Sequence, residues 1–189
     1  MRWDELFADL EGQLEAGLGA EERDREAEEE RLRLGRLSLR DRTAGIGAGD
    51  EPHLRIELTT GETLSLRPRT VGRDWVSGDL PGDAQGVLPL AGIAALLPTA
   101  AQLAASLRPV RQGSLTDRLG LPFVLRDLAR RRRGVEVVTR RDVLTGTLDR
   151  VGRDSVDLAT HAPDDWRRSG AVGGIRVLAL AEVLLVRVR

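Results

Sequence analysis

The sequence predicts a mainly β protein made of two tandem five-stranded barrels, with an N-terminal amphipathic helix and a helix between the barrels. Two observations lead to this fold class. A segment of the chain is repeated, and within each copy apolar residues alternate with polar ones at the period of a β-strand. We therefore expect three parts: a charged helix over residues 1–34, a first barrel over 36–99, and a second barrel with its preceding helix over 113–189.

The repeat is the strongest signal in the chain. Residues 64–77 (LSLRPRTVGRDWVS) align with residues 144–157 (LTGTLDRVGRDSVD) at an offset of 80, with six identities in fourteen positions. Residues 87–96 align with residues 177–186 at an offset of 90, so the second copy carries ten extra residues between the two blocks. The copies, residues 54–98 and 135–186, each have the length of a small barrel.

Strands follow from the alternation within each copy. In the first copy, Leu54, Ile56 and Leu58 alternate with polar residues, and a TTGET segment then supplies the glycine of a hairpin. Further strands begin near Leu64 and Leu144, near Val76 and Val156 and near Leu88, and the last strands are expected over 93–97 and 183–188. Short turns between such strands favour small antiparallel barrels.

The VGRD segment occurs in both copies, at residues 71–74 and 151–154. A structural role suffices to explain it: the glycine permits a sharp bend, the valine enters the core, and the aspartate accepts backbone N–H groups in the turn. Two equivalent binding loops are the alternative interpretation.

Helices are expected in two places. Residues 1–34 carry a net charge of −7, against +6 for the rest of the chain, and their apolar stripe indicates one helix to about Leu18, followed by a frayed charged continuation. Between the copies, Ser114 or Thr116 can cap a helix whose apolar face includes Leu121 and Leu125. The glycine-rich segment before the first copy predicts a short helix or none.

The order of a helix, a hairpin, a bent third strand and a final pair such as VLPLAG (87–92) or VLALAE (177–182) resembles the Sm-like fold. That family contains the Sm and LSm proteins and the bacterial host-factor RNA chaperone, and the resemblance covers residues 36–189. With its opening WDELFADLE, the chain also resembles a group from high-GC Gram-positive bacteria that is sometimes labelled as Fis-type transcriptional regulators. A Fis-type label implies a helix pair at the C-terminus, whereas this C-terminus reads as a strand.

The resemblance implies an RNA site that this chain does not reproduce. The family's asparagine falls near Ser77 and Asp157, and its basic or polar pair is replaced by Pro89-Leu90 and Ala179-Leu180. An aspartate repels phosphate, and apolar side chains do not hydrogen-bond base edges.

Two sets of residues remain as candidates for binding. The candidate nucleic-acid contacts are arginines after the linking helix and in the insertion of the second copy: Arg126, Arg130, Arg131, Arg132, Arg133, Arg167 and Arg168. A solvated helix end, favoured by the helix dipole, is the preferred explanation of the first five. The candidate partner contacts are the N-terminal stripe and one tryptophan of the insertion, which could instead close its own barrel: Trp3, Phe7, Leu10, Leu14 and Trp166.

Catalysis, cofactors and metals find no support in the residues. The chain has no cysteine, so disulfides, thiolate zinc sites and cysteine nucleophiles are excluded, and its two histidines, His53 and His161, lack a second histidine at ligand spacing. We expect a cytoplasmic protein that is not an enzyme, because no window approaches a membrane span and the start is acidic.

The leading hypothesis is a non-enzymatic interaction or assembly module, with a protein partner or self-association; a nucleic-acid-binding regulator is the alternative. Small barrels leave strand edges unpaired, and two barrels in one chain can satisfy one such edge internally. The outer edges could then pair head to tail into a ring, three chains giving six barrels, or the N-terminal helix could cover an edge and stop at a monomer or dimer.

Overall fold

The computed structural model describes residues 3–110, 113–161 and 173–188, excluding the side chains of residues 3–10, 12–17 and 20. The chain divides into two compact units, Met1–Leu37 and Ser38–Arg189, each considered by itself. The second unit holds ten antiparallel strands, so the prediction of a mainly β protein is confirmed. The strands are β1 (Leu54–Leu58), β2 (Thr63–Val71), β3 (Trp75–Asp79), β4 (Gln85–Pro89), β5 (Ile93–Leu97), β6 (Gly134–Thr139), β7 (Val143–Val151), β8 (Ser155–Thr160), β9 (Gly174–Ala179) and β10 (Val183–Val188).

The ten strands form one open sheet in the order β5-β1-β2-β3-β4-β10-β6-β7-β8-β9. The sequence predicted two tandem barrels with one edge satisfied inside the chain. The structure has one open sheet instead of two barrels, but the two copies do pair through one edge each. Strand β10, the last strand of the second copy, pairs with β4 of the first, with Val186 opposite Val87 and Arg187 opposite Gly86. This pairing joins the copies because each brings an edge strand that the other copy can extend.

The two halves of the sheet repeat one plan. Each has the strand order fifth-first-second-third-fourth, and its long second strand carries a bulge at the same place, between Pro68 and Thr70 in β2 and between Leu148 and Arg150 in β7. Both VGRD segments make the same turn, in which the glycine N–H of Gly72 or Gly152 donates to a carbonyl three residues later at 2.8 Å. The offsets of 80 and 90 read from the sequence therefore identify equivalent strands.

Each half has its own apolar core. The first is built on Leu54, Ile56 and Leu88 and also takes Leu184 and Leu185 from β10. The second is built mainly on residues of the second copy, but Trp75 and Val87 of the first copy belong to it. The cores thus exchange side chains across the β4–β10 contact, which buries apolar surface from both copies there.

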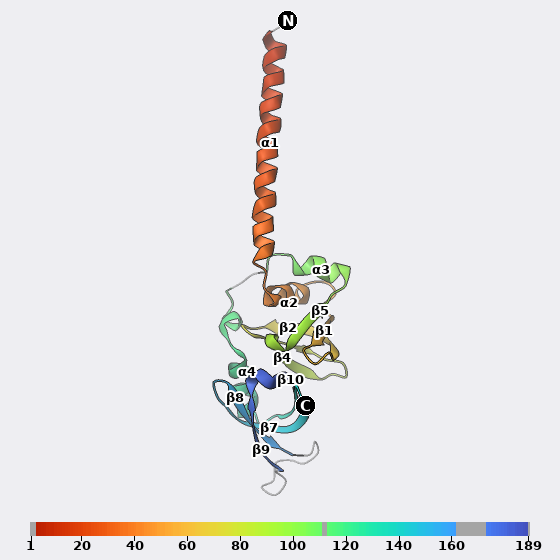
Figure 1. The fold of residues 1–189 in the computed structure, drawn as a ribbon, viewed down its shortest axis with the longest axis vertical. Coiled ribbons are helices and arrows are strands. Elements are labelled where there is room, and N and C mark those ends of the chain that lie inside the picture. The colour runs from red at the N-terminus through yellow and green to blue at the C-terminus, as the bar shows by residue number, and fades with distance from the viewer. Residues whose placement is uncertain (1–2, 111–112, 162–172, 189) are drawn as a thin grey trace. The chain divides into compact units, whose positions relative to one another are not determined.

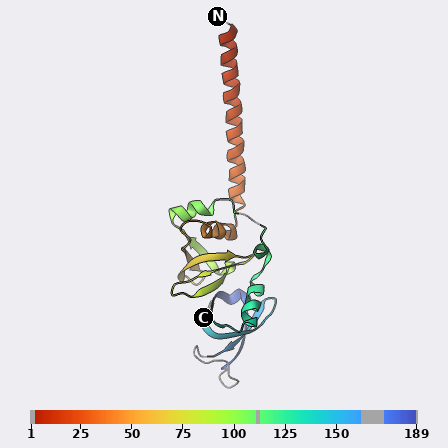
Figure 2. The same cartoon turned by 180° about the vertical axis from the view of Figure 1, so that it is seen from behind.

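A helix precedes each half. The glycine-rich segment before the first copy does form one, α2 (Leu39–Gly47), because Ser38 and Asp41 make a reciprocal capping box. Helix α2 packs on β2, and α4 (Leu121–Arg130) packs on the equivalent strand β7. Helix α3 (Ala100–Ser106), which the sequence reading missed, follows β5, begins with a capping box of Thr99 and Gln102, and packs against α2 (Figures 1 and 2).

Short 3-10 turns complete the second unit: η1 (Leu90–Gly92) and η3 (Leu180–Glu182) join the fourth and fifth strands of each half, and η2 (Leu115–Arg118) precedes α4. The helix predicted to begin at Ser114 is this turn followed by α4, since the residues Leu119 and Gly120 separate the two.

The first unit contains one helix, α1 (Trp3–Gly35). The expectation that it ends near Leu18 is wrong. Beyond that point the helix is lined by ion pairs three residues apart, Arg25 with Glu22 at 3.2 Å, Arg31 with Glu28 at 2.5 Å and Arg33 with Glu30 at 2.6 Å. Such pairs support an exposed helix.

Candidate interaction surfaces

The sheet ends at β5 on one side and at β9 on the other. Within the described residues, no strand pairs with the outer side of either strand. Both strands have a counterpart that is paired inside this chain, because β5 is equivalent to β10 and β9 is equivalent to β4. The outer edges of β5 and β9 are therefore equivalent to the edges of β10 and β4 that pair with each other in the middle of the sheet.

Strand β9 exposes two apolar side chains, and one of them stands where its counterpart β4 has a buried valine. Val177 is 70% exposed, whereas the equivalent Val87 of β4 is 5% exposed, and Ile175 of β9 is 63% exposed. Val87 lies opposite Val186 of β10, and nothing in the described chain takes that place beside Val177. Neighbouring exposed apolar residues on an unpaired strand are typical of a surface that receives another chain.

The β5 end carries an apolar hollow of about 350 Å³, formed between β5 and the two helices above it. Its walls include Leu39 and Ile46 of α2, Leu96 and Pro98 at β5, and Leu103 of α3. Leu39 and Leu121 are each the first residue of the helix that precedes a half, yet Leu39 is 38% exposed and Leu121 is 5% exposed. The start of α2 lacks the cover that the first copy provides for the start of α4.

That cover comes from the first VGRD turn. Its Arg73 N–H and the indole N–H of Trp75 both donate to the carbonyl of Leu119, at 3.1 and 2.9 Å. The Asp74 carboxylate accepts the N–H of Leu121 at 2.7 Å, which caps a helix whose own N-cap residue, Gly120, offers no side chain. The first turn thus holds the second copy's helix in place.

The second VGRD turn has the same backbone bonds but is open. Leu180 donates to the carbonyl of Asp154 at 2.8 Å, as Leu90 donates to that of Asp74 at 2.9 Å. Gly152, Arg153 and Asp154 are all exposed, and Ser155 stands where the first turn has Trp75. The side chain of Asp154 is therefore exposed to solvent, whereas the equivalent Asp74 caps α4.

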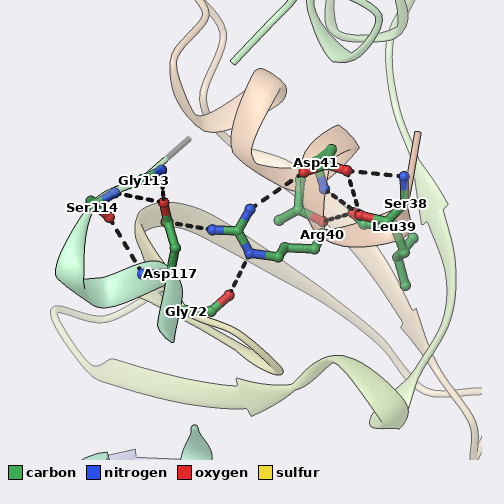
Figure 3. A network of polar contacts seen from close by, with 9 residues as sticks. Ser38, Leu39, Arg40, Asp41, Gly72, Gly113, Ser114 and Asp117 are labelled. Carbon is green, nitrogen blue, oxygen red and sulfur yellow. Dashed lines mark hydrogen bonds and ion pairs between the residues drawn. The ribbon is translucent and has the colours of Figure 1, made fainter. Parts of the chain in front are cut away.

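A polar network ties α2 to the segment before α4 (Figure 3). The guanidinium of Arg40 donates to the carbonyl of Gly72 at 2.8 Å and to carboxylate oxygens of Asp117 at 2.5 Å and Asp41 at 3.3 Å. Two capping boxes, Ser38 with Asp41 and Ser114 with Asp117, frame this arginine. A shallow hollow of about 500 Å³ lies beside it. The Nε atom and both terminal nitrogens of Arg40 already donate to groups of the protein.

Hydrogen bonds set the pKa values of these carboxyls. The pKa of Asp117 is lowered, first by the N–H of Gly113 and then by Ser114 and the charge of Arg40. Burial opposes ionisation of Asp41, but hydrogen bonds from Ser38 and the charge of Arg40 outweigh it and lower the pKa of this carboxyl as well. Both carboxylates are therefore stabilised in their charged form, as expected of structural groups.

The arginine cluster at α4 is largely engaged within the protein. Arg126 donates to the carbonyls of Val151 and Gly152, at 3.3 and 3.1 Å, just as Arg40 bonds the carbonyl of Gly72. Arg130 and Arg131 both donate to Asp127 at 2.6 Å, and these two bonds lower the pKa of that carboxyl. Three of the five arginine side chains therefore already have partners within the protein.

The last two arginines of this cluster end the helix. The N–H of Arg132 donates to the carbonyl of Ala129, and the N–H of Arg133 to that of Leu128, while Arg132 has a left-handed backbone with φ of 51°. These two bonds make a Schellman motif in which an arginine stands where glycine is preferred. Arg126, Arg130 and Arg132 also line a polar hollow of about 370 Å³ with Asp149.

Several sequence candidates are not tested by this geometry. Arg167, Arg168 and Trp166 lie outside the described residues. Trp3, Phe7, Leu10 and Leu14 lie on α1, and the described part of the structure does not include their side chains. Their proposed contacts remain predictions.

The positions singled out by the Sm-like resemblance fall within regular structure. Ser77 and Asp157 lie inside β3 and β8, and the Pro89-Leu90 and Ala179-Leu180 pairs stand where β4 and β9 pass into the 3-10 turns. His161 lies near Thr147, whose hydroxyl is 2.9 Å from its Nε2 atom, and His53 precedes β1. In the described residues, no three carboxylate, histidine or cysteine side chains cluster as a metal site would require.

Comparisons with protein-family models, with curated proteins and with solved structures gave no significant match. Among the helices of the described chain, none is long and apolar enough to cross a membrane.

Proposed function

We propose that this protein is a non-enzymatic, cytoplasmic assembly module in which each five-stranded half is an Sm-like unit and the outer edge of β9 is the principal interaction surface. One observation carries the proposal: Val177 is 70% exposed on β9, whereas Val87, its equivalent on β4, is 5% exposed. The β4 edge already binds a strand within the chain, so the same type of edge on β9 is built to bind one as well.

The repeated architecture supports the Sm-like part of this proposal. The helix before each half, the bulged second strand, the VGRD turn and the short turn between the last two strands occur twice in the same order. The absence of base-reading side chains at Ser77, Asp157 and the two apolar pairs favours protein rather than RNA as the partner.

The experiment is purification of the tagged chain from its native host, followed by mass measurement of the intact complex. Val177→Lys places a charge on the β9 surface, and we expect it to release the bound protein. Val143→Lys is the matched control, because Val143 is a comparably exposed valine (60%) on β7, away from the sheet edges. Equal recovery of the complex with both variants would remove β9 from the proposal.

A nucleic-acid-binding regulator is the second candidate, favoured by the polar hollow that Arg126, Arg130 and Arg132 line near α4. Fluorescence anisotropy with mixed RNA and DNA pools at low salt tests it. Submicromolar binding that weakens steeply with salt, and that is lost in an Arg130→Ala/Arg132→Ala/Arg133→Ala variant, would support this candidate over the assembly module. Arg126 is left in place in that variant because it bonds the carbonyls of Val151 and Gly152.

A further inference from the structure

We infer that the partner of the β9 edge is the β5 edge of a second copy of this chain, so that copies join head to tail. This inference rests on the proposed function, since it names the occupant of the surface proposed above. The template is the contact that the chain already makes with itself between β4 and β10.

The internal contact has a strand pairing and a helix cap. Val87 of β4 faces Val186 of β10, and the Asp74 carboxylate of the first copy holds the N–H of Leu121 at the start of α4. Two groups on the first copy's side of this contact have exposed counterparts at the β9 end, Val177 for Val87 and Asp154 for Asp74, whereas Ser155 replaces Trp75 there.

The opposite side of the contact has its counterparts at the β5 end. Leu96 is equivalent to Val186, which is 1% exposed. Leu39, like Leu121, is the first residue of the helix that precedes its half, although α2 is already capped by its own Ser38. Leu96 and Leu39 both line the apolar hollow of about 350 Å³. Val177 of one copy, placed opposite Leu96 of another, would enter this hollow and bury apolar surface on both.

The internal contact pairs a small residue of β4 with a large residue of β10, and the equivalent positions on β9 and β5 have the reverse order of sizes. Gly86 leaves room for two leucine side chains, because a Cβ atom there would lie 2.7 Å from the Cδ1 atom of Leu80 and 2.9 Å from that of Leu185, and both would have to shift. At the equivalent position β9 has the large Arg176, and the residues equivalent to Leu80 and Leu185 are the smaller Thr160 and Ala95. A large residue on one edge thus meets the small residue on the other, which is the complementarity expected if β9 and β5 pair.

The external contact is also built to be weaker than the internal one. Pro98 stands where β10 has Val188, which pairs with Gln85 of β4. Because proline has no N–H to donate, pairing on β5 stops earlier than on β10. We therefore expect reversible association that increases with protein concentration.

The proposed contact joins the β9 edge of one copy to the β5 edge of another, so each edge can be blocked by its own substitution. The full chain, its Val177→Lys variant and its Ala95→Arg variant are compared by sedimentation velocity over a wide concentration range. Val177→Lys blocks the β9 edge, whereas Ala95→Arg fills the small site on β5 and puts like charge against Arg176 of the other copy. The unmodified chain is expected to form species of two or more copies of its 20.6 kDa mass, and each variant to remain a monomer.

Mixing the two variants is the decisive step. The Val177→Lys chain keeps its β5 edge and the Ala95→Arg chain keeps its β9 edge, so the mixture is expected to form one-to-one dimers and nothing larger. Circular dichroism and thermal unfolding confirm that both variants are folded. The Val143→Lys chain should associate like the unmodified chain.

Other outcomes overturn the inference. Dimers of the Ala95→Arg chain together with monomers of the Val177→Lys chain indicate that two β9 edges pair with each other. If neither Val177→Lys nor Ala95→Arg alters the association, the copies contact each other through a surface other than β9 and β5. An unmodified chain that stays monomeric, while Val177→Lys still releases a protein from the native complex, leaves the proposed function standing and shows that the partner is a different protein.

Discussion

The carboxylate of Asp74 lies 2.7 Å from the backbone nitrogen of Leu121, whose N–H it accepts. These residues belong to different copies of the repeat. The sequence indicated that this aspartate bonds N–H groups of its own turn, but its Oδ1 atom instead caps the helix of the next copy. The first VGRD turn is therefore a joint between the halves, while the second turn has the same backbone and no such joint in the described chain.

Replacing Asp74 with alanine is expected to destabilise the second unit. Helix α4 would lose the side chain that satisfies its first N–H, and losses of caps cost about 0.5–2 kcal/mol. Urea unfolding followed by circular dichroism measures this change. The matched variant Asp154→Ala should unfold like the unmodified protein, because the Asp154 side chain is exposed in its turn; equal effects of the two substitutions would contradict the assignment of Asp74 as a cap.

The strands were predictable because duplication makes their pattern visible twice. The expected spans 54–58, 93–97 and 183–188 agree with β1, β5 and β10, and equal turns at Gly72 and Gly152 follow from the identical VGRD residues. An edge pairing within the chain was expected, but its strands, β4 and β10, were harder to predict, since they depend on which edges meet in space rather than on any local pattern. Only the size match of Gly86 and Leu185 hints at it in the sequence, and that match is readable once the pairing is known.

The helices show the limits of propensity. Glycines predicted a short helix or none before the first copy, and the nine-residue α2 begins there on the capping box of Ser38 and Asp41. Glycines also argued against a long N-terminal helix, yet α1 continues along its ion pairs. Thr99 and Gln102 form the same kind of capping box at the start of α3. The capping boxes of α2 and α3 can be recognised in the sequence. The contact of Arg126 with the carbonyls of Val151 and Gly152 depends on the fold.

Gly72 and Gly152 are expected to differ in their tolerance of alanine. A Cβ atom at Gly72 would overlap the indole ring of Trp75, whereas at Gly152 the nearest atom is the Oγ atom of Ser155 at 3.0 Å. Trp75 is buried and bonded to Leu119, so it has little room to move. Gly72→Ala should cost roughly 1–3 kcal/mol of unfolding free energy, in the range of overpacked sites, and Gly152→Ala clearly less. Chemical denaturation of both variants tests this, and a reversed order would show that the two turns differ from the arrangement described above.

Arg132→Gly is expected to stabilise the protein. The backbone of Arg132 has φ of 51° at the end of α4, a left-handed conformation that costs a residue with a side chain about 1 kcal/mol relative to glycine. The gain should appear as a higher unfolding temperature. Arg133→Gly is the control, since no positive φ is required there, and it should not stabilise the protein; a loss of stability in Arg132→Gly would show that its side chain contributes more than its backbone costs.

Acid should weaken the network around Arg40 through Asp117. Because the pKa of Asp117 is lowered in the folded chain, its stabilising effect is fully present above the unfolded value, about 3.9, and is lost as the pH falls through the lower folded value. Asp117→Asn should therefore lose less unfolding free energy than the unmodified protein between neutral and strongly acidic pH. Asp50→Asn, an exposed substitution, serves as the control and should keep the steeper dependence; identical profiles for all three proteins would exclude Asp117 as a contributor.

Pro98→Val is expected to strengthen self-association. The substitution gives β5 the residue that β10 has at Val188, and with it an N–H group at the position opposite Gln85 in the internal pair. A ladder extended by one hydrogen bond contributes on the order of 1 kcal/mol, so the dissociation constant should fall by roughly fivefold. Sedimentation equilibrium measures the change, and adding Val177→Lys to Pro98→Val should abolish it, because the gain requires the β9 edge of the other copy. A tighter dimer that survives Val177→Lys would place the effect of Pro98 on another contact and separate it from β9.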